Sequence, residues 1–176
     1  MQIRLESALV IEVPEADPLV APFRDLYDPA AAQGMPAHIT LLYPFKPPLE
    51  IADPQLAELR HCLLRFTAFQ FSLAEVKRFP QPVLYLAPEP AEPFRQLTVS
   101  LWECFPETPP YGGKHSEILP HLTLGQFTDE GQLEETAAAF ARAAEGKLPI
   151  RATASQVSLM DTRSGSWRVS STFPLH

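Results

Sequence analysis

Cysteine is scarce in this chain of 176 residues, which contains only Cys62 and Cys104. Two cysteines exclude a disulfide-rich scaffold, and their spacing does not match the close pairs that bind metals. Both lie in stretches whose apolar residues recur at helical intervals. We therefore expect two buried thiols in a reducing compartment and no disulfide.

Long hydrophobic runs are missing as well. The one apolar run near the N-terminus, Ala8 to Ile11, stops at Glu12 and has a single basic residue, Arg4, ahead of it. Such a run is too short for a signal peptide or a membrane span. We expect a soluble cytoplasmic protein without a membrane partner.

Positive charge is in short supply too. Lys and Arg number 14 against 21 Asp and Glu, which gives a formal net charge of −7. A protein that binds long nucleic acid through its phosphates needs clustered Lys and Arg. The composition therefore argues against a long nucleic-acid duplex as a partner. A single nucleotide or a short RNA terminus carries few phosphates and stays compatible.

A repeated tetrapeptide stands out in what the chain does contain, namely His38-Ile39-Thr40-Leu41 and His121-Leu122-Thr123-Leu124. A proline, at position 36 or 120, comes shortly before each copy. With 5 His and 10 Thr in 176 residues, chance predicts about 0.3 His-x-Thr triplets. Two copies with matching flanks are therefore not accidental.

Each copy is predicted to be a strand, because its surroundings are β-branched or apolar and end in turn signals. Residues i and i+2 of a strand share a face. His38 and Thr40 therefore point to one side while Ile39 and Leu41 point to the other, and the second copy does the same. Two strands that each present an imidazole and a hydroxyl indicate acid–base chemistry on an anionic group.

The rest of the chain mixes helices with strands. The spacing predicts strands at about 7–13, 69–78, 83–87, 150–161 and 167–173, and helices at about 17–27, 53–66, 90–105 and 129–146. Asp17 and Asp129 are the expected N-caps of two helices, and Leu26 is expected on a buried face. Consecutive strands at two places exclude a purely parallel winding and favour an α+β fold.

These motifs carry a resemblance to a known family. The stretch from Pro36 to Phe45, the triplet Tyr111-Gly112-Gly113 followed by Pro120 to Leu124, and both ends of the chain resemble the 2H phosphoesterase superfamily. The resemblance is closer to its bacterial branch, the 2′-5′ RNA ligase family. It extends over essentially the whole chain, and the paired motifs with their flanks are specific.

The resemblance implies a fold and an activity. The fold would be a single domain over residues 1–176, made of two ferredoxin-like lobes with facing antiparallel sheets around a central cleft, one motif in each lobe. The activity would be that of a metal-independent phosphodiesterase in RNA processing, acting on 2′,3′-cyclic or 2′-5′ phosphodiesters of RNA ends or small nucleotides. His38 and His121 would be the acid–base pair, and Thr40 and Thr123 would bind phosphate oxygens. The alternative is a non-catalytic module that binds nucleotides or RNA ends in the same cleft.

Further residues near the motifs are candidates for substrate binding. Tyr43, Phe45 and Tyr111 could stack on a base or pack in the core, and Lys114 could supply charge at the rim of the cleft or be solvated. No His-x-His or Glu-x-x-His pair occurs, so we expect no metal and no other cofactor. We expect a monomer.

Overall fold

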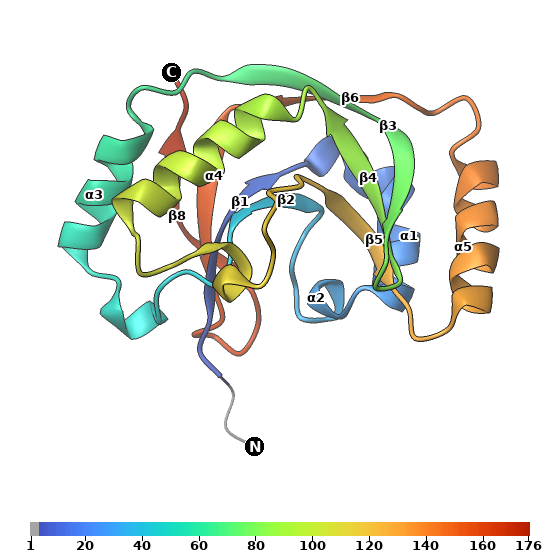
Figure 1. Cartoon of the computed structure of the whole chain (residues 1–176), viewed down its shortest axis with the longest axis horizontal. Coiled ribbons are helices and arrows are strands. Elements are labelled where there is room, and N and C mark those ends of the chain that lie inside the picture. The colour runs from blue at the N-terminus through green and yellow to red at the C-terminus, as the bar shows by residue number, and fades with distance from the viewer. Residues whose placement is uncertain (1–3) are drawn as a thin grey trace.

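Two antiparallel sheets of four strands each organise the chain, and the computed structural model describes residues 4–176 (Figure 1). The first sheet has the order β2-β1-β7-β8 and the second the order β5-β4-β3-β6. The α+β prediction is confirmed. The strands of the first sheet are β2 (His38–Leu42), β1 (Ser7–Glu12), β7 (Gln156–Asp161) and β8 (Arg168–Pro174), and those of the second are β5 (Leu122–Gln126), β4 (Val83–Glu89), β3 (Phe69–Phe79) and β6 (Ile150–Ala154).

Helices cover one face of each sheet. The helices α3 (Asp53–Leu63) and α4 (Glu92–Cys104) pack on the first sheet, against β8 and β2. The second sheet is covered by α1 (Asp17–Tyr27), which contacts β5, and by α5 (Glu130–Ala143), which contacts β4 (Figure 1). Short helices complete the chain: α2 (Pro29–Ala32), η1 (Pro14–Ala16), η2 (Pro48–Glu50) and η3 (Pro110–Gly113). None of the helices within residues 4–176 is long and apolar enough to cross a membrane.

The start and the buried face of α1 differ from the prediction. Ala16 is the N-cap, and Asp17 is the first helical residue, whose Oδ1 accepts a hydrogen bond of 3.3 Å from the backbone N–H of Ala37. Leu26 is 74% exposed, while Val20 and Arg24 are buried. The buried face of the helix is therefore rotated away from Leu26 and toward Arg24, whose charge is paired with that of Asp28. The prediction for α5 is confirmed, since Asp129 accepts bonds from the N–H groups of Gly131 and Gln132.

The predicted single strand over 150–161 is in fact two strands. β6 ends at Ala154 in the second sheet, and β7 begins at Gln156 in the first. Ser155 lies between them, and its carbonyl accepts a hydrogen bond of 2.8 Å from the N–H of Leu175. The chain therefore passes from one sheet to the other at this residue. Continuous apolar alternation hides that change of sheet.

The reverse faces of the two motif strands lie in the hydrophobic core. Ile39, Leu41, Leu122 and Leu124 are each at most 2% exposed. The alternation predicted from the repeated tetrapeptide is therefore confirmed for both strands. Because these four side chains are packed on all sides, they fix the position of the residues that alternate with them.

The two cysteines form a disulfide, so the prediction of two free thiols was wrong. Cys62 is on α3 and Cys104 is the last residue of α4, and their Cα atoms are 6.6 Å apart. This separation is within the range that a disulfide spans. Both helices cover the same sheet and pack against each other. The helical pattern around each cysteine indicates burial but not which helix will be its neighbour.

Candidate active site

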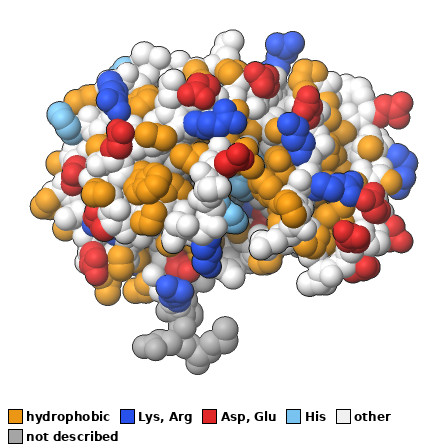
Figure 2. Space-filling view, viewed as in Figure 1, with side chains coloured by type: hydrophobic (Ala, Val, Ile, Leu, Met, Phe, Trp, Pro, Cys, Tyr) orange, Lys and Arg blue, Asp and Glu red, His pale blue; other side chains and the backbone are white. Residues whose placement is uncertain are grey.

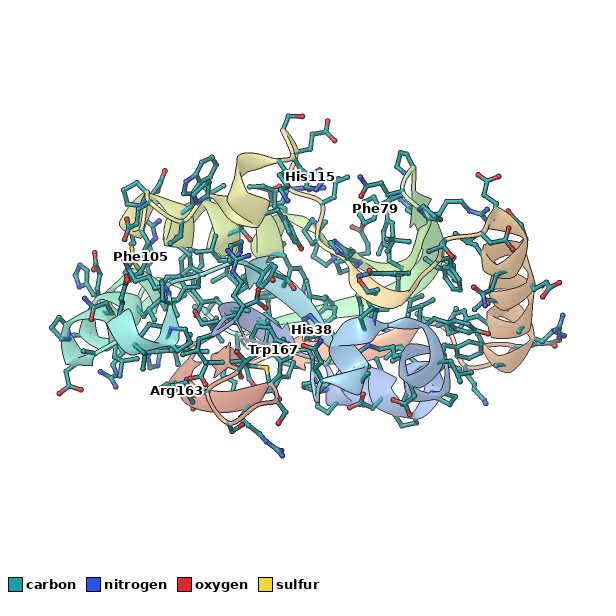
Figure 3. All side chains as sticks on the ribbon, turned by 90° about the horizontal axis from the view of Figure 1, so that it is seen from below. His38, Phe79, Phe105, His115, Arg163 and Trp167 are labelled. Atoms are coloured by element: carbon teal, nitrogen blue, oxygen red, sulfur yellow. A yellow bond between two sulfur atoms is a disulfide. The ribbon has the colours of Figure 1, made fainter. Side chains whose placement is uncertain are left out.

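The two histidines come from neighbouring edges of the two sheets. His38 is the first residue of β2, an edge strand of the first sheet, and His121 directly precedes β5, an edge strand of the second. β2 and β5 contact each other, and the two charges are close enough that His121 lowers the pKa of His38. Histidine atoms are visible near the middle of the face in Figure 2, and His38 lies near the middle of Figure 3. Motifs far apart in the sequence thus meet.

Both imidazoles are held by the same backbone contact. His38 Nδ1 lies 2.7 Å from the carbonyl oxygen of Pro36, and His121 Nδ1 lies 2.7 Å from that of Leu119. A carbonyl oxygen only accepts, so each Nδ1 carries the proton and donates it. In the neutral tautomer each Nε2 is then left with its lone pair for a reacting group. The two residues have matching orientation and the same protonation pattern.

Burial makes both histidines weaker bases than in water. Loss of solvent lowers the pKa of His38 to about 4, and the positive charge of Arg24 acts in the same direction. The bond to Pro36 and the charge of Asp28 oppose this. Burial also lowers the pKa of His121, and His115 adds to that effect while the bond to Leu119 opposes it. Both rings are therefore neutral at pH 7 before an anion binds.

A buried ion pair, which the sequence patterns did not reveal, acts on His38. Arg24 and Asp28 are one turn apart at the end of α1, with side chains 4% and 3% exposed. Arg24 Nη2 and Nε lie 2.9 Å and 3.0 Å from Asp28 Oδ2, and Asp28 Oδ1 accepts a bond from Ala30 at the start of α2. The signal in the sequence was an arginine on an apolar helix face followed by an aspartate four residues later.

Gly125 allows α1 to lie directly on the second motif strand. A methyl group at Gly125 would be 2.7 Å from Cβ of Tyr27 and 2.9 Å from the ring of Phe127. Real Cβ atoms do not approach other atoms so closely, so only glycine fits at this crossing. The contact places the C-terminal turn of α1, which includes Arg24, against β5.

Tyr111 connects the two motifs. Its ring stacks beside that of His121, with centroids 6.4 Å apart and planes at 24°. The neighbouring Thr40 partly offsets the effect of burial, which raises the pKa of the Tyr111 hydroxyl. The backbone N–H of Tyr111 donates to the carbonyl of Tyr43. Its backbone is left-handed, with φ 53°, a conformation that is uncommon outside glycine and is found at functional sites. A residue that touches both motifs is therefore held in a strained conformation.

Two cavities meet at Tyr111. One, the His121 cavity, has about 510 Å³ and is lined by His121 and Thr123 as well as Tyr111. The other, the Thr40 cavity, has about 220 Å³ and is lined by Thr40 and Tyr111. Each of the predicted phosphate-binding threonines therefore lines one of the two cavities, and Tyr111 lines both. A wider groove of about 1120 Å³ along α4 is lined by neither motif.

The remaining predicted residues lie further from the cavities. Tyr43 is half-buried, packs edge-on to Trp167 at 6.3 Å and donates to Glu6 Oε1 at 3.1 Å. Phe45 is 6% exposed and packs edge-on to Phe105 at 5.1 Å, which is the core packing expected as the alternative to stacking on a base. Lys114 is exposed at the end of η3 and lines neither of the two cavities.

The acidic, histidine and cysteine side chains do not gather around a common point. Within residues 4–176, no group of three or more of them is placed to hold a metal ion. Two imidazoles with hydroxyl groups beside them are side chains that can transfer protons and donate hydrogen bonds to an anion.

The fold, two four-stranded antiparallel sheets with helices on one face of each, is that of the 2H phosphoesterases. Residues 12–166 match the 2′-5′ RNA ligase superfamily, and the chain belongs to it. No curated protein matches the chain in sequence.

Solved structures share the fold over nearly the whole chain. TT0787 of Thermus thermophilus is similar with a TM-score of 0.64 and 19% identity, over 97% of each chain. E. coli LigT complexed with 3′-AMP is similar with a TM-score of 0.61 and 14% identity, also over 97% of each. A structure described as a phosphoesterase gives 0.59 and 16%, over 97% of this chain and 98% of the other.

Proposed function

We propose that this chain is a metal-independent phosphodiesterase that acts on 2′,3′-cyclic or 2′-5′ phosphodiesters of RNA ends or small nucleotides. The observation that carries the proposal is the matched pair of imidazoles, each with Nδ1 on a backbone carbonyl two residues earlier. Membership of the superfamily supports phosphoesterase activity. The E. coli LigT structures with 3′-AMP, ATP and NADP+ support a small nucleotide as ligand.

The proposed reaction opens a cyclic phosphate with water. His38 Nε2 takes a proton from the water, whose oxygen attacks phosphorus in line with the ribose oxygen that leaves. The bond from phosphorus to that ribose oxygen breaks, and His121 in its protonated form supplies the proton to it. Thr40 and Thr123 donate hydrogen bonds to the nonbridging oxygens. We assign the base to His38 because burial, with the charge of Arg24, outweighs the bond to Pro36 and the charge of Asp28 and lowers the pKa of the ring to about 4.

Incubation with adenosine 2′,3′-cyclic phosphate, followed by chromatography of the products, tests the proposal. We expect a single adenosine monophosphate, formed at the same rate in the presence of EDTA. Saturable binding without any product would favour the non-catalytic binding module instead. Activity lost in EDTA and restored by zinc or manganese would show that the two histidines do not act alone.

The pH dependence of the reaction follows from the lowered pKa values. The rate requires His38 neutral and His121 protonated, so kcat/KM should rise as pH increases through about 4 and fall before pH reaches the ordinary value of 6.5. The bound phosphate favours protonated rings, so the profile of kcat should lie at higher pH. Initial rates in constant-ionic-strength buffers check this. Identical profiles of kcat and kcat/KM would contradict it.

Replacement of Tyr111 distinguishes the contribution of its ring to activity from the effect of its backbone conformation on stability. Glycine adopts φ 53° freely, so in Tyr111→Gly the relief of backbone strain should offset about 1 kcal/mol of the free energy of unfolding that is lost with the packing of the ring. The same variant should lower kcat/KM about 10-fold or more, because the wall between the motifs is lost. Tyr111→Phe, the matched control, loses only the hydroxyl beside Thr40 and should cost no more than about 2–10-fold. Urea unfolding and steady-state kinetics measure both effects, and wild-type kinetics in Tyr111→Gly would exclude a role for the ring.

A further inference from the structure

The His121 cavity has an aromatic wall whose purpose the acid–base chemistry does not explain. Phe79, the last residue of β3, lines the cavity. One face of its ring stacks on Tyr85, with centroids 4.2 Å apart and planes at 22°. Its edge meets the ring of His121 at 5.0 Å. Tyr85 is buried behind it. Because Tyr85 covers one face and Phe79 lines the cavity, the opposite face of the Phe79 ring is the one that can contact a ligand there. Figure 3 labels Phe79.

An irregularity in β5 turns a glutamine toward the same cavity. Thr123 is paired with Tyr85 on β4, but Gln126 is paired with Val83, with a register shift between the two pairs. Val83 and Tyr85 are two residues apart and share a face, and paired residues of neighbouring strands point to the same side. Gln126 therefore shares the face of Thr123. Uninterrupted alternation would place it on the other face, so the bulge re-aims this side chain.

The lining of the cavity fits an uncharged group. No lysine or arginine lines it, and Glu117 does, so a second phosphate would be repelled there. Gln126 and Gln81 supply amide groups that can both donate and accept hydrogen bonds. At about 510 Å³ the cavity is in the size range of small-molecule sites. A flat aromatic face with amides at its margin is suited to a nucleobase.

We propose that the His121 cavity binds the nucleobase of the substrate, with Phe79 as the stacking wall and Gln126 as the group that contacts the edge of the base. This inference rests on the proposed function and adds the group that such a substrate must carry. A phosphate at the two histidines would place the attached nucleoside beside Thr123, on the face that Gln126 shares. A purine should bind more tightly than a pyrimidine, because it has the larger surface to stack on Phe79.

Two substrates that differ only in the base test the proposal. Adenosine 2′,3′-cyclic phosphate is compared with the 2,3-cyclic phosphate of methyl ribofuranoside, which has no base. The wild-type kcat/KM should be roughly 5–150-fold higher for the adenosine compound, the range of one base stacked on an aromatic ring. Phe79→Ala should remove most of this ratio, while Phe79→Tyr should keep it. Gln126→Leu should reduce it by about 2–10-fold.

Gln156→Leu is the matched control, because Gln156 is exposed at the start of β7 in the other sheet; its ratio should equal that of the wild type. A ratio unchanged in Phe79→Ala, or a loss of equal size for both compounds, would overturn the base site. If the wild type turns over neither compound, the proposed function fails. Calorimetry with adenosine 3′-monophosphate and methyl riboside 3-phosphate then decides: tighter binding of the first, lost in Phe79→Ala, supports the base site, and equal binding overturns it.

Discussion

Alanine in place of His121 is expected to lower kcat on a 2′,3′-cyclic nucleotide by roughly 10²–10⁴, the usual contribution of a positioned acid or base. The same loss is expected for His38→Ala. The two rings act in the same displacement at phosphorus, one accepting a proton and the other donating one, so the double variant should lose little more than either single one. Rapid-quench or steady-state measurement of kcat at saturating substrate gives these values.

The two variants should also differ in their pH profiles. His38→Ala should lose the limb at low pH, because that limb reports the loss of the His38 proton as pH rises. His121→Ala should lose the limb at high pH, which reports the loss of the His121 proton. His61→Ala is the control, since this histidine is exposed on α3, and it should behave as the wild type. An active His121→Ala protein with the full pH profile would place the chemistry at other residues.

Removal of Asp28 is expected to have the largest effect on stability. Its side chain and that of Arg24 are almost fully buried and lie 2.9 Å apart, so Asp28→Ala leaves a buried guanidinium without a counter-charge. Breaking such a pair from one side costs about 3–5 kcal/mol of the free energy of unfolding. The lost N-cap bond to Ala30 adds about 1 kcal/mol. Urea denaturation followed by circular dichroism measures the change.

A double replacement distinguishes the effect of the unpaired charge on stability from other effects of changing this helix. Arg24→Met with Asp28→Leu removes both charges and keeps apolar volume, and it should recover most of the stability that Asp28→Ala loses. Asp25→Ala, at an exposed position of the same helix, should change stability by no more than about 0.5 kcal/mol. A loss below about 1 kcal/mol in Asp28→Ala would mean that Arg24 finds another partner or water.

Alternation along a strand was sufficient to predict the two motifs. The spacing of His38 and Thr40 against Ile39 and Leu41 is a local property, and the buried reverse faces follow it. Alternation fails to predict the face of Gln126, because a single extra residue in β5 moves the residues that follow it to the opposite face of the sheet. The position of a bulge depends on the partner strand, which the sequence of β5 alone does not specify.

Residues that depend on tertiary neighbours were harder to place. Arg24 is buried only because Asp28 neutralises it, and Cys62 finds Cys104 only because two helices share a sheet. The aromatic residues divide in the same way. Phe45 and Tyr111 look alike as candidates in the sequence, but the first packs on Phe105 in the core and the second stacks beside His121. The packing partners of an aromatic residue, and not its type, decide whether it belongs to the core, as Phe45 does, or to the candidate site, as Tyr111 does.

The change of sheet at Ser155 has a consequence for how the protein can be divided. A fragment that ends at Ala154 contains both His-x-Thr motifs, Tyr111 and the Arg24–Asp28 pair. It lacks β7, however, which pairs with β1, and β1 in turn holds β2 and His38. The second sheet is encoded by one continuous stretch, from β3 to β6, but the first is divided between β1 and β2 near the start of the chain and β7 and β8 near its end. Such a fragment would carry every candidate site residue and still be unable to assemble the site, so the smallest working unit extends through β8.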